Sequence, residues 1–384
     1  MRVLYIFDED DKYGAAKAGM EMVKEVKKNN IIPIVVTSNS NRINFQCDKL
    51  EIENYSTGHH KFTYCLTSSK LNNIVKFLPR FFRYKISLYV ALYKIGKKID
   101  LSTIDIIHSN NSGIDLGVEL SRKYNIPNII HIREYGVGDN GYRVHSYRKN
   151  YIKYFNRYVN KFILISNAVS EFWIKKGIDK SKIEKIYDGV DTENIKIAQN
   201  NNKKIRFIIL GSISEGKGQI ELLKALNLLN SKAKSQIEID IVGSGTKEDE
   251  LLLISKIKKY NLEKIVFFKG YDGKIYEKLN NYDFGINCSK AEGFGRTTIE
   301  YLSSGLFVIA SSIGANKELI CDKKLGTLYE IGNEEDLSKS LLYVINNKRI
   351  LFKEKEYRVD YARQFSVYNN CNEVIKVYKE LINK

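Results

Sequence analysis

Short runs of apolar residues alternate with longer segments in which apolar residues recur every three or four positions. Runs of the first kind are typical of buried strands, and segments of the second kind are typical of amphipathic helices. In the first half of the chain the predicted strands cover residues 3–7, 32–37, 104–108, 128–132 and 162–165. The predicted helices end at residues 28, 98 and 159, or cover residues 114–124 and 168–176. Residues 41–68 are polar and irregular with weak strand signals, and residues 133–143 are expected to form a Gly-rich loop.

The same alternation starts again after a polar stretch and runs almost to the end of the chain. The predicted strands of this half cover residues 205–210, 237–242, 265–269, 282–288 and 307–310. The predicted helices cover residues 219–230, 247–260, 334–347, 351–364 and 369–382, with a short one that ends at Gly305. Strands and helices that alternate at these lengths predict βαβ units and parallel sheets.

A chain of 384 residues is too long for one ordinary core. The polar residues 192–204 are a candidate linker, so we expect an α/β protein with Rossmann-like domains at residues 1–191 and 205–365. In open sheets of this type, ligands bind at the carboxyl ends of the strands. Gly14 and Gly211 are predicted to lie at such ends.

Composition restricts the class of protein further. The five cysteines are scattered and lack metal-binding spacing, which argues for a reducing compartment and against zinc. The N-terminal residues run into the acidic residues 8–11 and do not resemble a signal peptide. No apolar run reaches the ~18 residues that span a bilayer. We therefore expect a soluble, cytoplasmic protein.

The net charge of +17 implies an anionic partner, which is nucleic acid, an anionic membrane or a phosphorylated substrate. Residues 54–99 contain nine Lys or Arg and no acid, and residues 75–98 interleave aromatic with basic side chains. Such a segment suits the surface of an anionic membrane, and it equally suits an ordinary surface helix with snorkelling lysines. We find no helix-turn-helix, zinc or RNA-binding motif that supports nucleic-acid binding.

The most informative stretch is residues 289–320, which follow a predicted strand. Glu292 and Glu300 lie eight residues apart around a Gly-Phe-Gly turn, Gly293 to Gly295, which precedes a predicted helix. Glycine lets the backbone come close to a ligand, and the first N–H groups of a helix favour an anion such as phosphate. Acceptor carboxylates beside such donors suit a ligand that carries hydroxyls and phosphates together. A plain turn in an α/β protein remains the alternative interpretation.

This pattern resembles the E-x7-E motif of retaining GT-B glycosyltransferases, in particular glycosyltransferase family 4. The resemblance covers nearly the whole chain and is strongest over residues 205–320. It implies two Rossmann-like domains whose parallel sheets face an interdomain cleft, with residues 366–384 packing back on the N-terminal domain. It also implies that Glu292 contacts the hydroxyls of the donor sugar and that Glu300 contacts the ribose of the nucleotide.

The resemblance assigns roles to further residues. For Lys217 the resemblance implies a cationic contact to the diphosphate. Ser212 stands where the family typically has arginine, so Arg296 is a candidate to supply the missing positive charge. For His131 the resemblance implies a place in the site, facing the donor sugar and phosphate. Asp188 is interpreted as part of a structural turn. The remaining donor-binding candidates are Gly14, Gly211, Gly293, Phe294, Gly295 and Tyr271.

The implied reaction moves a sugar from a UDP- or GDP-sugar to an acceptor hydroxyl with the anomeric configuration retained. No metal and no other cofactor is expected. The implied acceptor is a polyprenyl-diphosphate-linked or other glycan in bacterial cell-surface polysaccharide synthesis, which suits a cytoplasmic enzyme peripheral to the inner face of the membrane. A GT-B-fold nucleotide-sugar epimerase and a basic nucleic-acid-binding protein are the alternatives.

Overall fold

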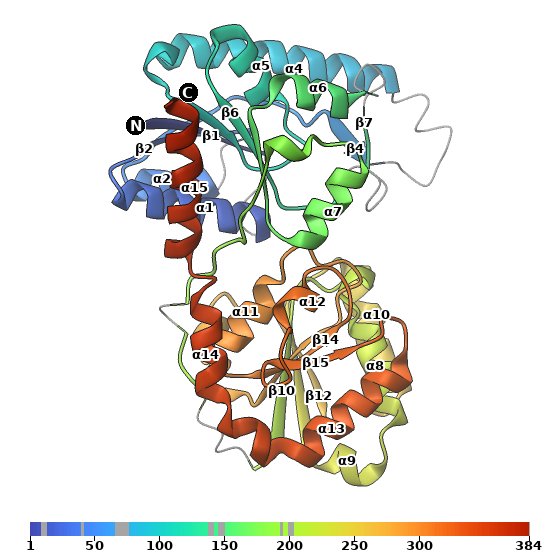
Figure 1. Ribbon diagram of the computed structural model, residues 1–384. Coiled ribbons are helices and arrows are strands. Elements are labelled where there is room, and N and C mark those ends of the chain that lie inside the picture. Colours follow the sequence, from blue (N-terminus) through green and yellow to red (C-terminus); the bar gives the residue numbers. More distant parts are fainter. Residues whose placement is uncertain are drawn as a thin grey trace. The chain divides into compact units, whose positions relative to one another are not determined.

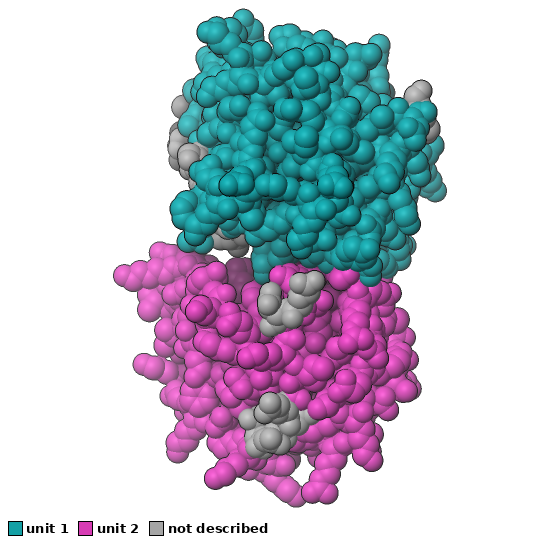
Figure 2. Space-filling model, turned by 90° about the vertical axis from the view of Figure 1, so that its left-hand side faces the viewer, with its two compact units in different colours: residues 1–189, 367–384 teal, residues 190–366 magenta. Residues whose placement is uncertain are grey.

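The structure is a computed structural model of the whole chain, shown in Figure 1. It describes residues 1–8, 14–39, 42–65, 77–136, 142–144, 150–192, 195–198 and 203–383. Parts of the acidic N-terminal run, of the basic segment 75–98, of the loop 133–143 and of the linker 192–204 lie outside these ranges. The chain divides into two compact units, residues 1–189 with 367–384 and residues 190–366 (Figure 2).

The first unit contains a parallel sheet of seven strands in the order β3-β2-β1-β5-β6-β8-β9. Its strands are β1 (Arg2–Phe7), β2 (Ile32–Thr37), β3 (Glu53–Ser56), β5 (Ile106–Ser109), β6 (Asn128–Ile132), β8 (Lys161–Leu164) and β9 (Ile183–Lys185). A separate antiparallel pair joins β4 (Thr63–Cys65) and β7 (Tyr142–Val144). The central strands are almost entirely buried, which is why apolar residues predominate in them.

Helices cover both faces of this sheet. They are α1 (Gly14–Lys28), α2 (Arg42–Lys49), α4 (Phe77–Lys98), α5 (Leu116–Tyr124), α6 (Tyr151–Tyr158), α7 (Asn167–Lys175) and α15 (Val367–Ile382). One core contains side chains of α1, α2 and α15 together with Val3, Tyr5 and Phe7 of β1. On the opposite face α5 packs on Ile6 and Ile107, and α4 and α6 flank α5 (Figure 1).

The second unit contains a parallel sheet of six strands in the order β12-β11-β10-β13-β14-β15. Its strands are β10 (Ile205–Leu210), β11 (Ile237–Val242), β12 (Val266–Gly270), β13 (Phe284–Asn287), β14 (Phe307–Ser311) and β15 (Gly326–Tyr329). Its helices are α8 (Gln219–Leu228), α9 (Ser231–Ser235), α10 (Lys247–Lys259), α11 (Arg296–Ser303), α12 (Asn316–Leu319), α13 (Glu334–Lys353) and α14 (Lys355–Arg363). Its core joins α8, α10 and α13 to the strands, and α11 packs on α14 (Figure 1).

The expected α/β fold with two parallel sheets is confirmed, and most predicted elements are found within a few residues of their predicted bounds. The region 41–68, which we expected to be irregular, contains the helix α2. This helix has only eight residues and buries Ile43, Asn44 and Cys47, which is too short a stripe to show a period. The helix predicted at residues 334–347 continues to Lys353, and the next helix begins at Lys355.

The prediction also missed the strands β9 and β15. β9 is a three-residue edge strand, and β15 begins with Gly326, a residue type that is depleted in strands. A Cβ at Gly326 would lie 2.3 Å from the carbonyl oxygen of Val308 on the neighbouring strand, which explains the glycine. Among the residues that the structure describes, no helix combines the length and apolar character needed to cross a bilayer.

Candidate functional site

The predicted site in the second unit is built from loops at the carboxyl ends of neighbouring strands. The loop that follows β10 hydrogen-bonds to the loop that follows β11, since Gly211 N donates to Val242 O (3.1 Å) and Ile213 N to Ser244 O (2.9 Å). Gly243 N in turn donates to Gly270 O at the end of β12 (2.9 Å). These bonds tie the loops into one edge, which is where ligands bind in open α/β sheets.

The loop after β10 is also fixed to the loop after β13. Gly218 has a φ of +70°, and a Cβ there would lie only 2.2 Å from the carbonyl oxygen of Cys288. Lys290 N donates to Gly216 O (2.8 Å), and Lys290 Nζ lies 2.8 Å from Glu215 Oε1. The close backbone approach therefore requires glycine, and it brings Lys217 to the Glu292 loop.

Lys217 and Glu292 meet at this edge. Lys217 Nζ lies 3.5 Å from Glu292 Oε2 and donates to Ser289 Oγ at 3.2 Å. The other carboxylate oxygen of Glu292 accepts from Gly295 N (3.1 Å), just before α11 begins. The Glu292 side chain is 12% exposed and that of Lys217 35% exposed, so part of the Lys217 side chain is accessible to a ligand.

Glu300, the second carboxylate of the motif, lies in the interior of α11 and is buried. Its Oε1 atom is 4.0 Å from Nη2 of Arg296, one turn earlier on the same helix. Arg296 is the first residue of α11 and its side chain is mostly buried. The positive charge therefore lies at the N-terminal end of α11, next to the Glu292 loop.

A buried polar network supports this loop, and we did not predict it. Asn287 at the end of β13 donates to Thr298 Oγ1 (3.0 Å), which donates to Asn316 Oδ1 (3.1 Å). Ser311 Oγ donates to the carbonyl of Ser289 (2.7 Å). The available signal was a polar residue, Asn287, at the end of a predicted buried strand; its partners come from two later segments and could not be identified from spacing.

Tyr301 anchors α11 to the sheet. Its hydroxyl accepts from Leu210 N (2.7 Å) at the end of β10, and burial raises its pKa well above the ordinary value. A Cβ on Gly285 would lie 2.2 Å from the Tyr301 ring. The small residue in β13 therefore makes room for the ring that positions the helix.

The other candidates of the second unit differ in accessibility. Gly211 has a φ of +148°, and the aliphatic part of Lys217 lies 3.7 Å from where its Cβ would be. Ser212 is exposed and its carbonyl accepts from Gln219 Nε2 (2.9 Å). Tyr271 is 70% exposed just after β12. Phe294 is buried with its ring 5.9 Å from that of Phe365, so its side chain serves packing.

Two candidates, Gly14 and His131, belong to the first unit, and the other ten belong to the second. Gly14 begins α1 and is exposed. His131 lies on β6, is fully buried, and has Nδ1 3.2 Å from Nε2 of His108. Its Nε2 lies 3.8 Å from Asp188 Oδ1 and has no hydrogen-bond partner among the described residues. Burial, and then the nearby charge of Arg133, lower the pKa of His131 well below its ordinary value.

His131 is one member of a longer buried chain of polar groups. His108 Nδ1 lies 2.7 Å from the Tyr378 hydroxyl of α15, which lies 3.0 Å from the Tyr5 hydroxyl of β1. Arg133 Nε lies 3.0 Å from Asp188 Oδ1, so the turn that we interpreted as structural contains the buried counter-ion of this region. His108 and His131 are both fully buried, so their ring nitrogens face only other groups of the protein.

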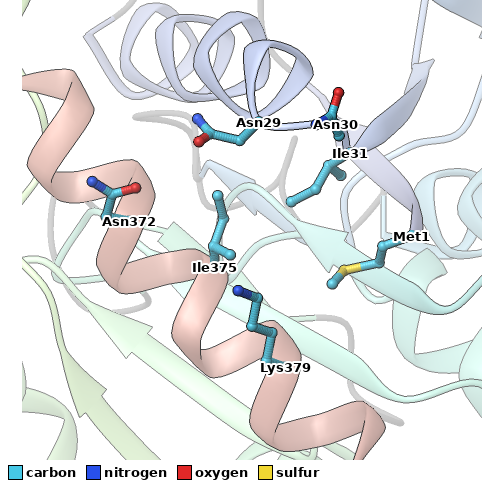
Figure 3. A pocket seen from close by; sticks show the side chains of 7 residues that line it. All are labelled: Met1, Asn29, Asn30, Ile31, Asn372, Ile375 and Lys379. Carbon is cyan, nitrogen blue, oxygen red and sulfur yellow. The ribbon is translucent and has the colours of Figure 1, made fainter.

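Two further features bear on other kinds of site. Within the described ranges no three His, Cys, Asp or Glu side chains gather in a way that could hold a metal ion. A cavity of about 310 Å³ lies beside α15 in the first unit (Figure 3). It is lined by Met1, Asn29, Asn30, Ile31, Asn372, Ile375 and Lys379. None of the candidate site residues lines it, and no acidic side chain is among the lining residues.

The fold is that of solved glycosyltransferases over almost the whole chain. Anabaena HepE, solved in complex with UDP and glucose, is similar with a TM-score of 0.81 at 17% identity, covering 99% of this chain and 100% of that chain. A glycosyltransferase from Rickettsia africae gives a TM-score of 0.78 at 20% identity, covering 99% and 98%. The chain thus has the two-domain GT-B fold of glycosyltransferases.

The sequence comparisons identify the family. The model for glycosyl transferases group 1 matches residues 190–365, and that for glycosyltransferase family 4 matches residues 53–194. The chain belongs to glycosyltransferase family 4, the group 1 glycosyl transferases, and is a glycosyltransferase. The resemblance seen in the E-x7-E motif is therefore confirmed.

Two relatives illustrate the range of the family. The N-acetylgalactosamine-N,N'-diacetylbacillosaminyl-diphospho-undecaprenol 4-alpha-N-acetylgalactosaminyltransferase of Campylobacter jejuni is 27% identical over 243 residues, which are 58% of this chain and 64% of that relative's length. An uncharacterized glycosyltransferase of Methanocaldococcus jannaschii is 28% identical over 329 residues, covering 81% of this chain and 86% of the relative.

Proposed function

We propose that this protein transfers a sugar from a nucleoside-diphosphate sugar to an acceptor hydroxyl with retention of the anomeric configuration. One observation carries the proposal: Lys217 and Glu292 lie together beside the start of α11, at the strand ends of the second unit. Lys217 Nζ is 3.5 Å from one carboxylate oxygen of Glu292, and the other oxygen accepts from Gly295 N. A cation, a carboxylate and a helix N-terminus at one place suit a ligand with both phosphates and hydroxyls.

The charges suit the chemistry of glycosyl transfer. Breaking the bond between sugar and phosphate builds negative charge on the leaving diphosphate. Lys217 and the N-terminal end of α11 are fixed where they can stabilise that charge, and Arg296 is the candidate for a second cation. Glu292 accepts hydrogen bonds from the donor sugar, and Glu300 from the ribose. We assign no nucleophile and no metal to the reaction, and the roles expected for His131 and Gly14 of the first unit stay predictions.

We propose UDP as the nucleotide of the donor. The likeness to Anabaena HepE, solved in complex with UDP and with UDP-glucose, supports UDP over GDP. Tyr271, which is 70% exposed at the strand-end edge, is the candidate that contacts the base. Its ring can stack on a nucleobase as aromatic side chains do elsewhere.

We propose a lipid-linked glycan as the acceptor, in bacterial cell-surface polysaccharide synthesis at the cytoplasmic face of the membrane. The name of the Campylobacter jejuni relative, a transferase acting on a diphospho-undecaprenol substrate, supports this class of acceptor. The excess of basic residues in the chain, with a net charge of +17, also suits a substrate that carries a diphosphate.

The test is a screen of UDP- and GDP-sugars with polyprenyl-diphosphate-linked acceptors, followed by NMR of the product. We expect a new glycosidic bond whose anomeric configuration matches the donor. An inverted product would contradict the retaining mechanism. Isomerised donor without any transfer would favour the epimerase alternative.

A further inference from the structure

Helix α4 (Phe77–Lys98) has two apolar faces, and only one of them is buried. Tyr84, Leu88, Ala91 and Ile95 face the interior of the first unit. The hydroxyl of Tyr84 donates to the carboxylate of Asp115, which precedes α5. This face alone explains why α4 is helical and how it is held in the fold.

The opposite face carries large apolar side chains that are exposed. Leu78 is 60% exposed, Phe82 58%, Ile86 62%, Tyr89 74% and Tyr93 59%. Their spacing of four, four, three and four residues places all five within an arc of about 80° on a helix of 3.6 residues per turn. We call these five residues the α4 stripe.

Single exposed apolar residues are normal, but a contiguous row of them marks an interaction surface. The α4 stripe runs along most of a 22-residue helix, and this helix lies on the outer side of the first unit in Figure 1. The buried face of the same helix is already satisfied by the core. The stripe is therefore not needed for packing within the first unit.

Charge selects the occupant of this surface. Helix α4 contains six Lys or Arg and no acidic residue. On a helical wheel Lys85 and Lys97 border the α4 stripe on its two sides, and Arg83 and Lys94 lie beyond Lys97. Arg83 Nε and Lys94 Nζ bond to His60 and to the carbonyl of Thr57, so that side is braced against the domain. Lys97 Nζ lies 5.6 Å from the centre of the Tyr93 ring.

A second copy of the chain is a poor match, because pairing two such stripes would bring their basic borders together. Nucleic acid matches the charge but offers no apolar surface for the α4 stripe. An anionic lipid surface matches both features, since acyl chains accept the apolar residues and headgroups accept the basic ones. Tyrosines at the same level suit the boundary between them.

We propose that α4 lies flat on an anionic lipid bilayer, with Leu78, Phe82, Ile86, Tyr89 and Tyr93 at the acyl boundary and the bordering lysines among the headgroups. The surface adds a docking site to the proposed transfer reaction. It requires neither donor nor acceptor. Vesicle binding measured without substrates therefore tests it separately, and a negative result would leave the transfer reaction untouched.

The experiment is co-flotation of the full chain with vesicles of phosphatidylcholine, with and without phosphatidylglycerol. The test variant is L78S/F82S/I86S. The matched control is L251S/L252S on α10 of the second unit, where Leu251 and Leu252 are 57% and 48% exposed. All three proteins are first compared by circular dichroism and thermal unfolding, because exposed positions should tolerate serine.

We expect wild type and the control to bind the anionic vesicles equally and the stripe variant to bind more than about tenfold more weakly. K85Q/K97Q should weaken binding only to anionic vesicles, by about tenfold at low salt. Equal binding by wild type and stripe variant would overturn the proposal. So would a wild-type dimer that the stripe substitutions dissociate, since a second copy would then occupy the surface.

Discussion

At the residue scale, Lys217 and Glu292 matter because each is held by neighbours that do not take part in the chemistry. Glu292 accepts from Gly295 N and from Asn287 Nδ2 of the Asn287–Thr298–Asn316 network, and Lys217 donates to Ser289. Such support keeps charged groups oriented before a ligand arrives, which is the condition for strong electrostatic stabilisation of a transition state.

The substitution Glu292→Gln removes the negative charge of this side chain but keeps its hydrogen bond from Gly295 N. The glutamine carbonyl can still accept from Gly295 N, so we expect an unchanged unfolding midpoint. We expect kcat/KM for sugar transfer to fall by about 10²- to 10³-fold, because the donor hydroxyls lose a charged acceptor. Steady-state kinetics check this. The control is Glu215→Gln, which breaks an exposed pair with Lys290 and should change kcat/KM less than about threefold. Equal effects of both substitutions would contradict the assignment.

Arg296 offers a test by rescue. If it supplies the cation missing at Ser212, Arg296→Leu should lower kcat/KM by about tenfold or more, and Ser212→Arg in the same chain should restore much of that loss. If Arg296 instead serves only Glu300, whose Oε1 lies 4.0 Å away, arginine at the exposed position 212 will restore nothing. Kinetics of the two single variants and the double variant distinguish these outcomes.

At the element scale, the strand-end edge of the second unit depends on loops whose backbones come closer together than a side chain with a Cβ would allow. The apolar runs in the sequence were enough to predict the strands that carry these loops, because buried parallel strands are continuous in hydrophobicity. Apolar runs could not predict α2 and β9, which are short, or β15, which begins with glycine. The buried polar chain from Tyr5 to Tyr378 could not be predicted from the sequence, because it joins residues 373 positions apart.

Two glycines with almost the same backbone conformation test the close approach. Gly218 and Gly270 have φ of +70° and +69°. A Cβ added at Gly218 would lie 2.2 Å from Cys288 O, whereas one added at Gly270 would meet nothing within 4 Å. We expect Gly270→Ala to cost about 1 kcal/mol of stability through backbone strain alone. Gly218→Ala should cost clearly more and should also reduce transfer, because Lys217 precedes it. Denaturant unfolding and kinetics check both variants, and equal costs would contradict the packing argument.

At the scale of the whole molecule, the two units have separate sheets and separate cores, and they differ in buried titratable groups. All five histidines precede residue 190, so the second unit has none. Burial lowers the pKa of His59 to about 4, and it lowers the pKa values of His108 and His131 well below 6.5. With these lowered pKa values, the three side chains are neutral in the folded first unit near neutral pH.

This difference predicts a selective response to acid. Below pH 6.5 the histidines of the unfolded chain bind protons, whereas the buried histidines of the folded chain do not. The free energy of unfolding of the first unit is therefore highest above pH 6.5 and falls as the pH drops. One pH unit below 6.5, each buried histidine should cost about 1.4 kcal/mol. Hydrogen exchange at pH about 7.5 and 5.5 should show protection falling in the strands of the first unit and little change in those of the second. Equal loss in both units would contradict the prediction.

The central claim is that the strand-end edge of the second unit binds an activated sugar through Lys217 and Glu292. Calorimetric titration with UDP and with UDP-sugars tests it most directly. We predict that wild type binds both ligands and that Lys217→Ala weakens both by about tenfold or more. Glu292→Ala should weaken only the UDP-sugar that the enzyme uses and leave UDP unchanged. Binding that neither substitution alters, or no binding of any nucleotide by the folded wild type, would contradict the account.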